Sequence, residues 1–262
     1  LAFDETNLFQ PTLNEREPDF LRKLETMGKK VVFITNNSSL SNEENRSRIS
    51  RILGIPLDSV FVFSSLDHLA RFLETEKIAN PLLLLNEEPS NQLGCFSANG
   101  TPDAVIVGFF TEGNYEDLKK ACLAIQNGAR FFLAHSDKRC PTEEGFIPDA
   151  GSLGDLVQTV TGKAPAFVGG KPSKEMLEGV AGKFGVDISE IVYFGDRIYT
   201  DLEMVRGTKA KGVLMLTGET SMEEFAEQWS SWDASFREQV FLGESFPYLS
   251  SLVERILSSK EK

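Results

Sequence analysis

Short apolar runs alternate with amphipathic stretches along most of this chain, and that alternation limits its fold more than any other feature. The runs are apolar at every position, as strands covered on both faces of a sheet are. Helical spacing of apolar residues fills most of the intervals between them. We therefore expect an α/β fold with mainly parallel sheets. The expected strands are residues 31–34, 60–63, 82–85, 104–107, 131–133, 166–168, 191–194 and 213–216.

Glycine and capping residues mark the ends of several expected helices. Helices at residues 15–27, 115–127 and 173–184 are each followed by a glycine, which ends a helix without steric cost. Ser41 and Glu44 have the spacing of a capping box, in which each side chain bonds to the backbone of the other residue. The next helix is therefore expected to begin at Ser41.

Length and charge exclude several classes of function. With 262 residues the chain exceeds the usual length of one domain, so one large or two modest domains are expected. Its net charge is −12, from 27 Lys and Arg against 39 Asp and Glu, and no basic cluster stands out. This argues against nucleic acid or an anionic membrane as the main partner. No apolar run approaches the ~20 residues that span a bilayer.

Cysteine usage and the first residues suggest a compartment. The three cysteines are widely spaced and form no CxxC pair, which is typical of reduced thiols in the cytoplasm. The N-terminus has no signal-peptide pattern, because Asp4 follows Leu1 so closely. We therefore expect a cytoplasmic protein. The chain begins inside an expected strand, so we also expect a few residues to precede Leu1.

Polar residues suited to phosphate chemistry follow the apolar first residues of the chain and three of the apolar runs. In open α/β sheets, ligands bind at the carboxyl ends of the strands. An acid, a hydroxyl, a lysine and a second acid therefore meet the requirements for holding a phosphoryl group and a divalent cation. These residues are Asp4, Thr35, Lys171 and Asp196.

The motifs around these residues resemble those of the haloacid dehalogenase superfamily, in the branch of NagD-like sugar phosphatases and 4-nitrophenylphosphatases. The resemblance covers nearly the whole chain, and the order and spacing of the motifs make it specific. The matching segments are residues 33–39, Gly170-Lys171-Pro172-Ser173, Gly195-Asp196-Arg197 with Thr200-Asp201, and the cap-like residues 121–131 and 141–152.

The resemblance implies a catalytic role for Asp4 and Lys171. Asp4 would be the nucleophile that receives the phosphoryl group, and Lys171 would neutralise charge on both. Thr35, Asn36 and Asn37 would bind the phosphate. Asp4 and Thr35 are also typical of turns and loop caps, and a lysine such as Lys171 is by default a surface residue.

The resemblance also implies a magnesium site. Asp4, Asp196 and the carbonyl of Thr6 would be ligands, with Asp201 as an outer or alternate ligand. The alternative for Asp196 and Asp201 is that the two acids only complement the dipole of a helix.

Two positions depart from the family pattern. The first motif normally reads Asp-x-Asp-Gly-Thr, and Thr6 stands where its second Asp acts as general acid and base. Threonine cannot titrate near neutral pH, so that catalytic role has no evident holder. In the cap, His135 stands before Asp137 where the branch usually has Thr-Asn. His135 is a candidate for substrate contact, with a structural histidine as the alternative.

From the resemblance we expect a Rossmann-like core of residues 1–66 and 168–262 with a parallel sheet, and an inserted smaller α/β cap domain of residues 67–167. The active site would lie in the cleft between them. The expected function is hydrolysis of a small phosphorylated metabolite with Mg²⁺ through an aspartyl-phosphate, weakened by Thr6. The alternative is a catalytically silent protein that binds a phosphorylated metabolite. A homodimer formed through the cap would suit the family.

Overall fold

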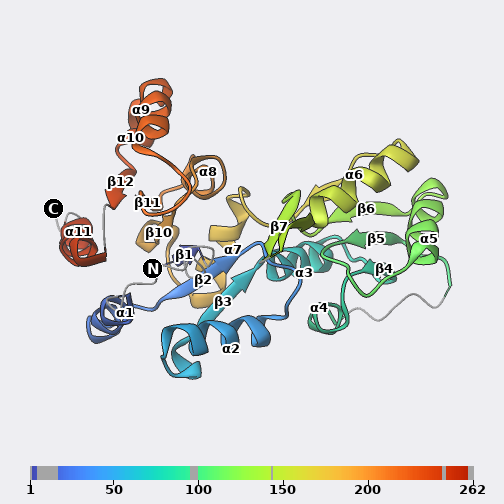
Figure 1. Ribbon diagram of the computed structural model, residues 1–262, viewed down its shortest axis with the longest axis horizontal. Helices are drawn as coiled ribbons and strands as arrows, with labels where there is room; N and C mark the ends of the chain where they lie inside the picture. Colours follow the sequence, from blue (N-terminus) through green and yellow to red (C-terminus); the bar gives the residue numbers. More distant parts are fainter. Residues whose placement is uncertain (1, 5–16, 95–99, 143, 244–245, 259–262) are drawn as a thin grey trace. The chain divides into compact units, whose positions relative to one another are not determined.

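The chain folds into two compact units, seen here in a computed structural model (Figure 1). The structure describes residues 2–4, 17–94, 100–142, 144–243 and 246–258. The first unit comprises Leu1–Ile34, Arg46–Val62 and Pro172–Lys262, and the second comprises Thr35–Asn45 and Phe63–Lys171. The second unit is thus an insertion in the first.

A six-stranded sheet in the order β12-β11-β10-β1-β2-β3 forms the centre of the first unit (Figure 1). Strand β1 lies between β10 and β2 and is parallel to both, with Phe3 opposite Phe194 and Asp4 opposite Ile34. The carboxyl ends of these three strands therefore share one edge. The strands are β1 (Ala2–Asp4), β2 (Val32–Thr35), β3 (Phe61–Ser64), β10 (Val192–Gly195), β11 (Lys211–Met215) and β12 (Val240–Gly243).

Apolar side chains from the strands pack against helices to form the core of this unit. Phe33 and Phe194 lie in one buried cluster with residues of α1 and α11, and burying an aromatic ring of this size stabilises the fold by about 2–3 kcal/mol. The helices described around this sheet are α1 (Glu17–Thr26), α2 (Asn42–Leu53), η2 (Leu57–Ser59), α7 (Glu175–Phe184), η3 (Ile188–Glu190), the π-helix η4 (Ile198–Leu202), α8 (Glu203–Val205), α9 (Met222–Ser231), α10 (Ala234–Arg237) and α11 (Phe246–Ser258).

The second unit is built on a parallel four-stranded sheet in the order β4-β5-β6-β9. Along β5, Val105 and Val107 pack with α5 and α6, whereas Ala104 and Ile106 pack with α3 on the other face. A strand covered on both faces explains why its sequence is apolar at every position. The elements are α3 (Ser65–Thr75), β4 (Pro81–Leu84), α4 (Glu87–Gln92), β5 (Ala104–Val107), α5 (Tyr115–Gln126), β6 (Arg130–Leu133), α6 (Ala150–Thr161) and β9 (Phe167–Val168).

The α/β fold with parallel sheets that the sequence predicts is confirmed, and two features go beyond it. A polar antiparallel hairpin joins β7 (Arg139–Thr142) to β8 (Gly145–Pro148) in the second unit. Its strands are largely exposed, so they lack the apolar run by which the other strands were found. The second feature is the grouping of Thr35–Asn45 with the second unit, although these residues were expected in the core. None of the described helices has the length and apolarity that crossing a membrane requires.

Candidate functional site

Asp196 occupies a tight turn at the carboxyl end of β10 in the first unit. Its side chain is buried, and its Oδ2 accepts a hydrogen bond of 2.8 Å from the backbone N–H of Glu219. Gly218 is essential to this arrangement, because a Cβ there would stand only 2.0 Å from Asp196 Oδ2. The backbone of one turn thus approaches the carboxylate of another as closely as glycine allows. This contact fixes the position of the carboxylate.

Asp201 stabilises the same turn through hydrogen bonds. It lies on the π-helix η4, a type of helix often found at functional sites, and it is completely buried. Its Oδ1 accepts a 2.8 Å bond from the Tyr193 hydroxyl, and its Oδ2 accepts 3.1 Å bonds from the N–H groups of Asp196 and Arg197. These bonds give Asp201 a structural role. Its predicted part in metal binding stays a prediction.

A second pair of side chains ties the Asp196 turn to the turn after β11. Arg197 Nε donates a 2.7 Å bond to Glu219, and the Tyr199 hydroxyl donates to the same carboxylate. Burial and the hydrogen bond to Glu219 raise the pKa of Tyr199 to about 12, so the phenol stays a neutral donor at physiological pH. Glu219 is therefore held by a cation and a hydroxyl while its N–H holds Asp196.

Motif one is only partly described. The backbone of Asp4 ends β1, next to β10, and Asp196 follows β10 directly. Thr6 lies outside the described residues, as does the side chain of Asp4. Their predicted roles as metal ligands and as nucleophile stay predictions.

The donor set at this sheet edge suits a magnesium ion. Asp196 offers a buried carboxylate that backbone contacts hold in place, and Asp4 would add a second carboxylate from the neighbouring strand. Mg²⁺ prefers such oxygen ligands, typically one or two carboxylates with water and substrate oxygens. The residues present thus fit the ion that the sequence analysis expects.

In the second unit, the loop after β2 is held by its own side chains. Thr35 is buried, and its Oγ1 accepts a 2.8 Å bond from the N–H of Asn37. Asn37 Oδ1 in turn accepts 2.8 and 2.6 Å bonds from the N–H and hydroxyl of Ser39. These bonds are the turn chemistry that the sequence offers as the alternative to phosphate binding. Phosphate binding by Thr35 and Asn37 stays a prediction.

Lys171 is buried, and Asn36 binds both its backbone N–H and its backbone carbonyl. The Lys171 N–H donates a 2.6 Å bond to Asn36 Oδ1, and Asn36 Nδ2 donates a 3.3 Å bond to the Lys171 carbonyl. Gly170 has φ +77°, and a Cβ on it would lie 2.4 Å from Asn36 Oδ1. The default expectation for a lysine, an exposed surface position, is therefore wrong here.

His68 supports the same segment. It is buried, and its Nδ1 accepts a 3.2 Å bond from the Gly170 N–H. Its ring also meets the Phe167 ring edge to face at 5.1 Å. No short-range sequence signal predicts this contact, because His68 and Gly170 are 102 residues apart.

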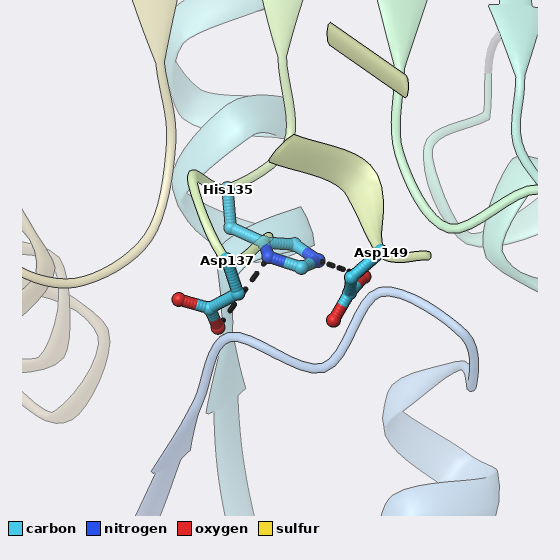
Figure 2. A group of neighbouring side chains, drawn as sticks. All are labelled: His135, Asp137 and Asp149. Atoms are coloured by element: carbon cyan, nitrogen blue, oxygen red, sulfur yellow. Dashed lines mark ion pairs between the residues drawn. The ribbon is translucent and has the colours of Figure 1, made fainter. Parts of the chain in front are cut away.

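His135 lies between two carboxylates of the second unit (Figure 2). Its Nδ1 is 3.5 Å from Asp137 Oδ2, and its Nε2 is 3.5 Å from Asp149 Oδ1 and 2.9 Å from Ser38 Oγ. Only 1% of its surface is exposed, and its described contacts are those of a structural histidine. Substrate contact by His135 stays a prediction.

Burial and the neighbouring charges shift the pKa values of the two carboxylates next to His135. Burial alone would raise the pKa of Asp137, but its contact with His135, the charges of His135 and Lys171, and the Asn36 amide together lower it to about 2. The pKa of Asp149 is raised by burial, which outweighs the opposing effects of the His135 charge and the Ala150 N–H. Asp137 is therefore an ionised acceptor over the whole physiological range.

The three residues also have ligand atoms within 4.8 Å of one another, a spacing that a metal ion could bridge. Direction argues against such an ion. The two carboxylates face opposite nitrogens of the imidazole (Figure 2), and a metal ion binds one ring nitrogen, in the plane of the ring. An ion bound at one ring nitrogen would therefore reach one carboxylate, and the other carboxylate would still face the opposite nitrogen. We therefore interpret this group as a cluster of ion pairs around the imidazole.

Comparison with known proteins places the chain among hydrolases. A family model described as "Haloacid dehalogenase-like hydrolase" matches residues 10–93, and one described as "HAD-hyrolase-like" matches residues 168–235. The 5'-nucleotidase YutF of Bacillus subtilis is 30% identical over 217 residues, which cover 81% of this chain and 84% of that protein. An acid sugar phosphatase of Staphylococcus saprophyticus is 28% identical, over 75% of this chain and 77% of that protein.

A solved structure supports the same relationship. The crystal structure of a 4-nitrophenylphosphatase from Thermotoga maritima superposes with a TM-score of 0.74 and is 31% identical. The match covers 86% of this chain and 88% of that one. Both compact units are therefore included in the similarity.

Proposed function

This chain belongs to the haloacid dehalogenase-like hydrolases and is a phosphatase of their NagD and 4-nitrophenylphosphatase branch, and from that premise we propose that it hydrolyses a small phosphorylated metabolite with Mg²⁺. The observation that carries the proposal is the pair of acids at adjacent strand ends: Asp4 ends β1, and the buried Asp196 follows the neighbouring β10. Mg²⁺ supplies charge neutralisation for the phosphoryl group when it is bound.

The proposed reaction has two steps. The Asp4 carboxylate attacks phosphorus, the bond from phosphorus to the leaving oxygen breaks, and an aspartyl-phosphate forms. Water then attacks that phosphorus, which releases inorganic phosphate and restores the Asp4 carboxylate. Lys171 balances negative charge on the phosphoryl group, and Thr35 with the N–H of Asn36 binds its oxygens. Burial of Lys171 supports this role, because a charge contributes most where water is excluded.

Thr6 favours a second candidate function, a protein that binds a phosphorylated metabolite without turning it over. A threonine cannot protonate the leaving oxygen, and a positioned acid or base typically contributes ~10²–10⁴-fold to the rate. We propose slow turnover rather than none, because nitrophenolate leaves as a stable anion and needs no proton. Aryl phosphates should therefore be hydrolysed faster than sugar phosphates.

The test compares the wild type with Thr6→Asp on both substrate types in Mg²⁺. We expect Thr6→Asp to raise turnover of a sugar phosphate by about 10-fold or more, and that of nitrophenyl phosphate by less. Lys171→Ala should lower turnover of both by ~10²-fold or more while the variant stays folded. If the wild type already hydrolyses sugar phosphates as fast as Thr6→Asp does, another group supplies the proton and this account of Thr6 is wrong. No turnover of either substrate by either protein would favour the silent binding protein.

A further inference from the structure

The backbone of Lys171 is held by one amide side chain. Asn36 accepts from the Lys171 N–H at 2.6 Å and donates to the Lys171 carbonyl at 3.3 Å. A backbone bonded on both sides by a buried side chain has little freedom to shift, so the start of the Lys171 side chain is fixed in place. This works only if the amide is oriented with its oxygen toward the N–H and its NH₂ group toward the carbonyl.

Asp137 sets that orientation. A carboxylate accepts hydrogen bonds and donates none, so it can face only the NH₂ end of an amide. Asp137 Oδ2 lies 3.2 Å from Asn36 Nδ2, across 101 residues of sequence. If the amide were flipped, its oxygen would meet the Asp137 carboxylate and the Lys171 carbonyl, and its NH₂ group would meet the Lys171 N–H. All three contacts would become repulsive.

His135 in turn lies against Asp137, with its Nδ1 3.5 Å from Asp137 Oδ2 (Figure 2). On the other side of the ring, its Nε2 is 2.9 Å from the Ser38 hydroxyl, which also accepts a 2.9 Å bond from the Phe109 N–H. Ser38 and Asn36 belong to the same loop, so two of its side chains are held by the segment that follows β6.

We propose that Asp137 and His135 are positioning residues for the phosphatase reaction, which fix Lys171 through the Asn36 amide. The inference rests on the proposed function, in which the Lys171 ammonium balances charge on the phosphoryl group. Neither residue touches the substrate in this scheme. A misplacement of about 1 Å in a group that stabilises the transition state lowers the rate by up to ~10²-fold, so such residues matter to kcat.

The test is a set of variants assayed with nitrophenyl phosphate and Mg²⁺. Asp137→Ala should lower kcat by about 10–100-fold with little change in KM, and Asp137→Asn should retain more activity because it preserves an acceptor oxygen. The matched control is Asp155→Ala, which removes a carboxylate of the same unit that is 62% exposed and forms an ion pair with Lys138. Its kcat should equal that of the wild type.

Two double variants separate positioning from a general structural effect. If Asp137 acts through Asn36 and Lys171, adding Asp137→Ala to Asn36→Ala or to Lys171→Ala should change kcat less than 2-fold. The same fold loss in all three backgrounds would show that Asp137 only stabilises the unit, and the proposal would be overturned. Wild-type kcat in Asp137→Ala would overturn it as well.

Affinity for inorganic phosphate keeps this test separate from the test of hydrolysis. If the wild type has no turnover, calorimetry with phosphate and Mg²⁺ is applied to the same variants. A loss of affinity in Asp137→Ala that disappears in the Lys171→Ala background supports positioning even though hydrolysis has failed. Equal phosphate affinity in the wild type and Asp137→Ala, or no phosphate binding by the wild type, overturns the proposal.

Discussion

Asp137 is a partly buried carboxylate whose side chain is 31% exposed. Its partners are a histidine, an amide and the charge of Lys171, and together they outweigh the cost of burial. A group with a lowered pKa stabilises the folded state only while it is ionised. Its contribution is therefore complete above the ordinary pKa of 3.8 and is lost as the pH falls toward about 2.

The free energy of unfolding should report this directly. Asp137→Asn removes the ionisable group, so the wild type should lose about 1–2 kcal/mol more stability than the variant as the pH falls from 4.5 to 2. Urea unfolding at a series of pH values measures the difference. Asp155→Asn is the matched control, because that exposed carboxylate should leave the pH dependence of the wild type unchanged. Parallel curves for the wild type and Asp137→Asn would contradict the assignment.

At the scale of elements, the turn that holds Asp196 depends on close backbone contact. The turn after β11 brings Gly218 against Asp196 while the N–H of Glu219 binds its Oδ2. Asp201 on η4 also accepts a bond from the Asp196 N–H, and the Tyr193 hydroxyl of β10 donates to Asp201. The site therefore relies on three adjacent elements rather than on one residue.

Gly218→Ala tests this arrangement. Its Cβ would meet Asp196 Oδ2 at 2.0 Å, so either the carboxylate or the turn must move. We expect Mg²⁺ affinity to fall by about 10–100-fold, with turnover partly restored at high Mg²⁺ concentration. The measurement is the Mg²⁺ dependence of nitrophenyl phosphate hydrolysis, with Glu227→Ala on the exposed face of α9 as the control. An unchanged Mg²⁺ dependence would show that Asp196 is not a ligand.

Sequence patterns predicted the elements better than the contacts between them. The buried strands were recognisable because both faces are covered, and the capping box is confirmed by the 2.7 Å bond from the Ser41 N–H to Glu44. The links from Asp137 to Asn36 and from His68 to Gly170 span about a hundred residues, so only the folded chain brings them together. The exposed β7–β8 hairpin has no apolar run and was missed for that reason.

For the molecule as a whole, the central claim is a phosphatase reaction that proceeds through Asp4 with Mg²⁺. The family relationship covers both compact units, while the related proteins have different names: a nucleotidase, a sugar phosphatase and a nitrophenylphosphatase. Shared chemistry with different substrates is what a common catalytic unit with a variable cap would produce. Under the proposed function, Asp4 and Asp196 of the first unit act together with Thr35, Asn36 and Lys171 of the second unit.

The most direct measurement is release of nitrophenolate by the wild type and by Asp4→Asn, each in Mg²⁺ and in a chelator. The account predicts turnover by the wild type in Mg²⁺, its loss in the chelator, and at least a ~10³-fold loss in Asp4→Asn, because a carboxamide cannot accept the phosphoryl group. A correctly folded wild type without turnover in Mg²⁺ would contradict the claim. So would an Asp4→Asn variant that is as active as the wild type.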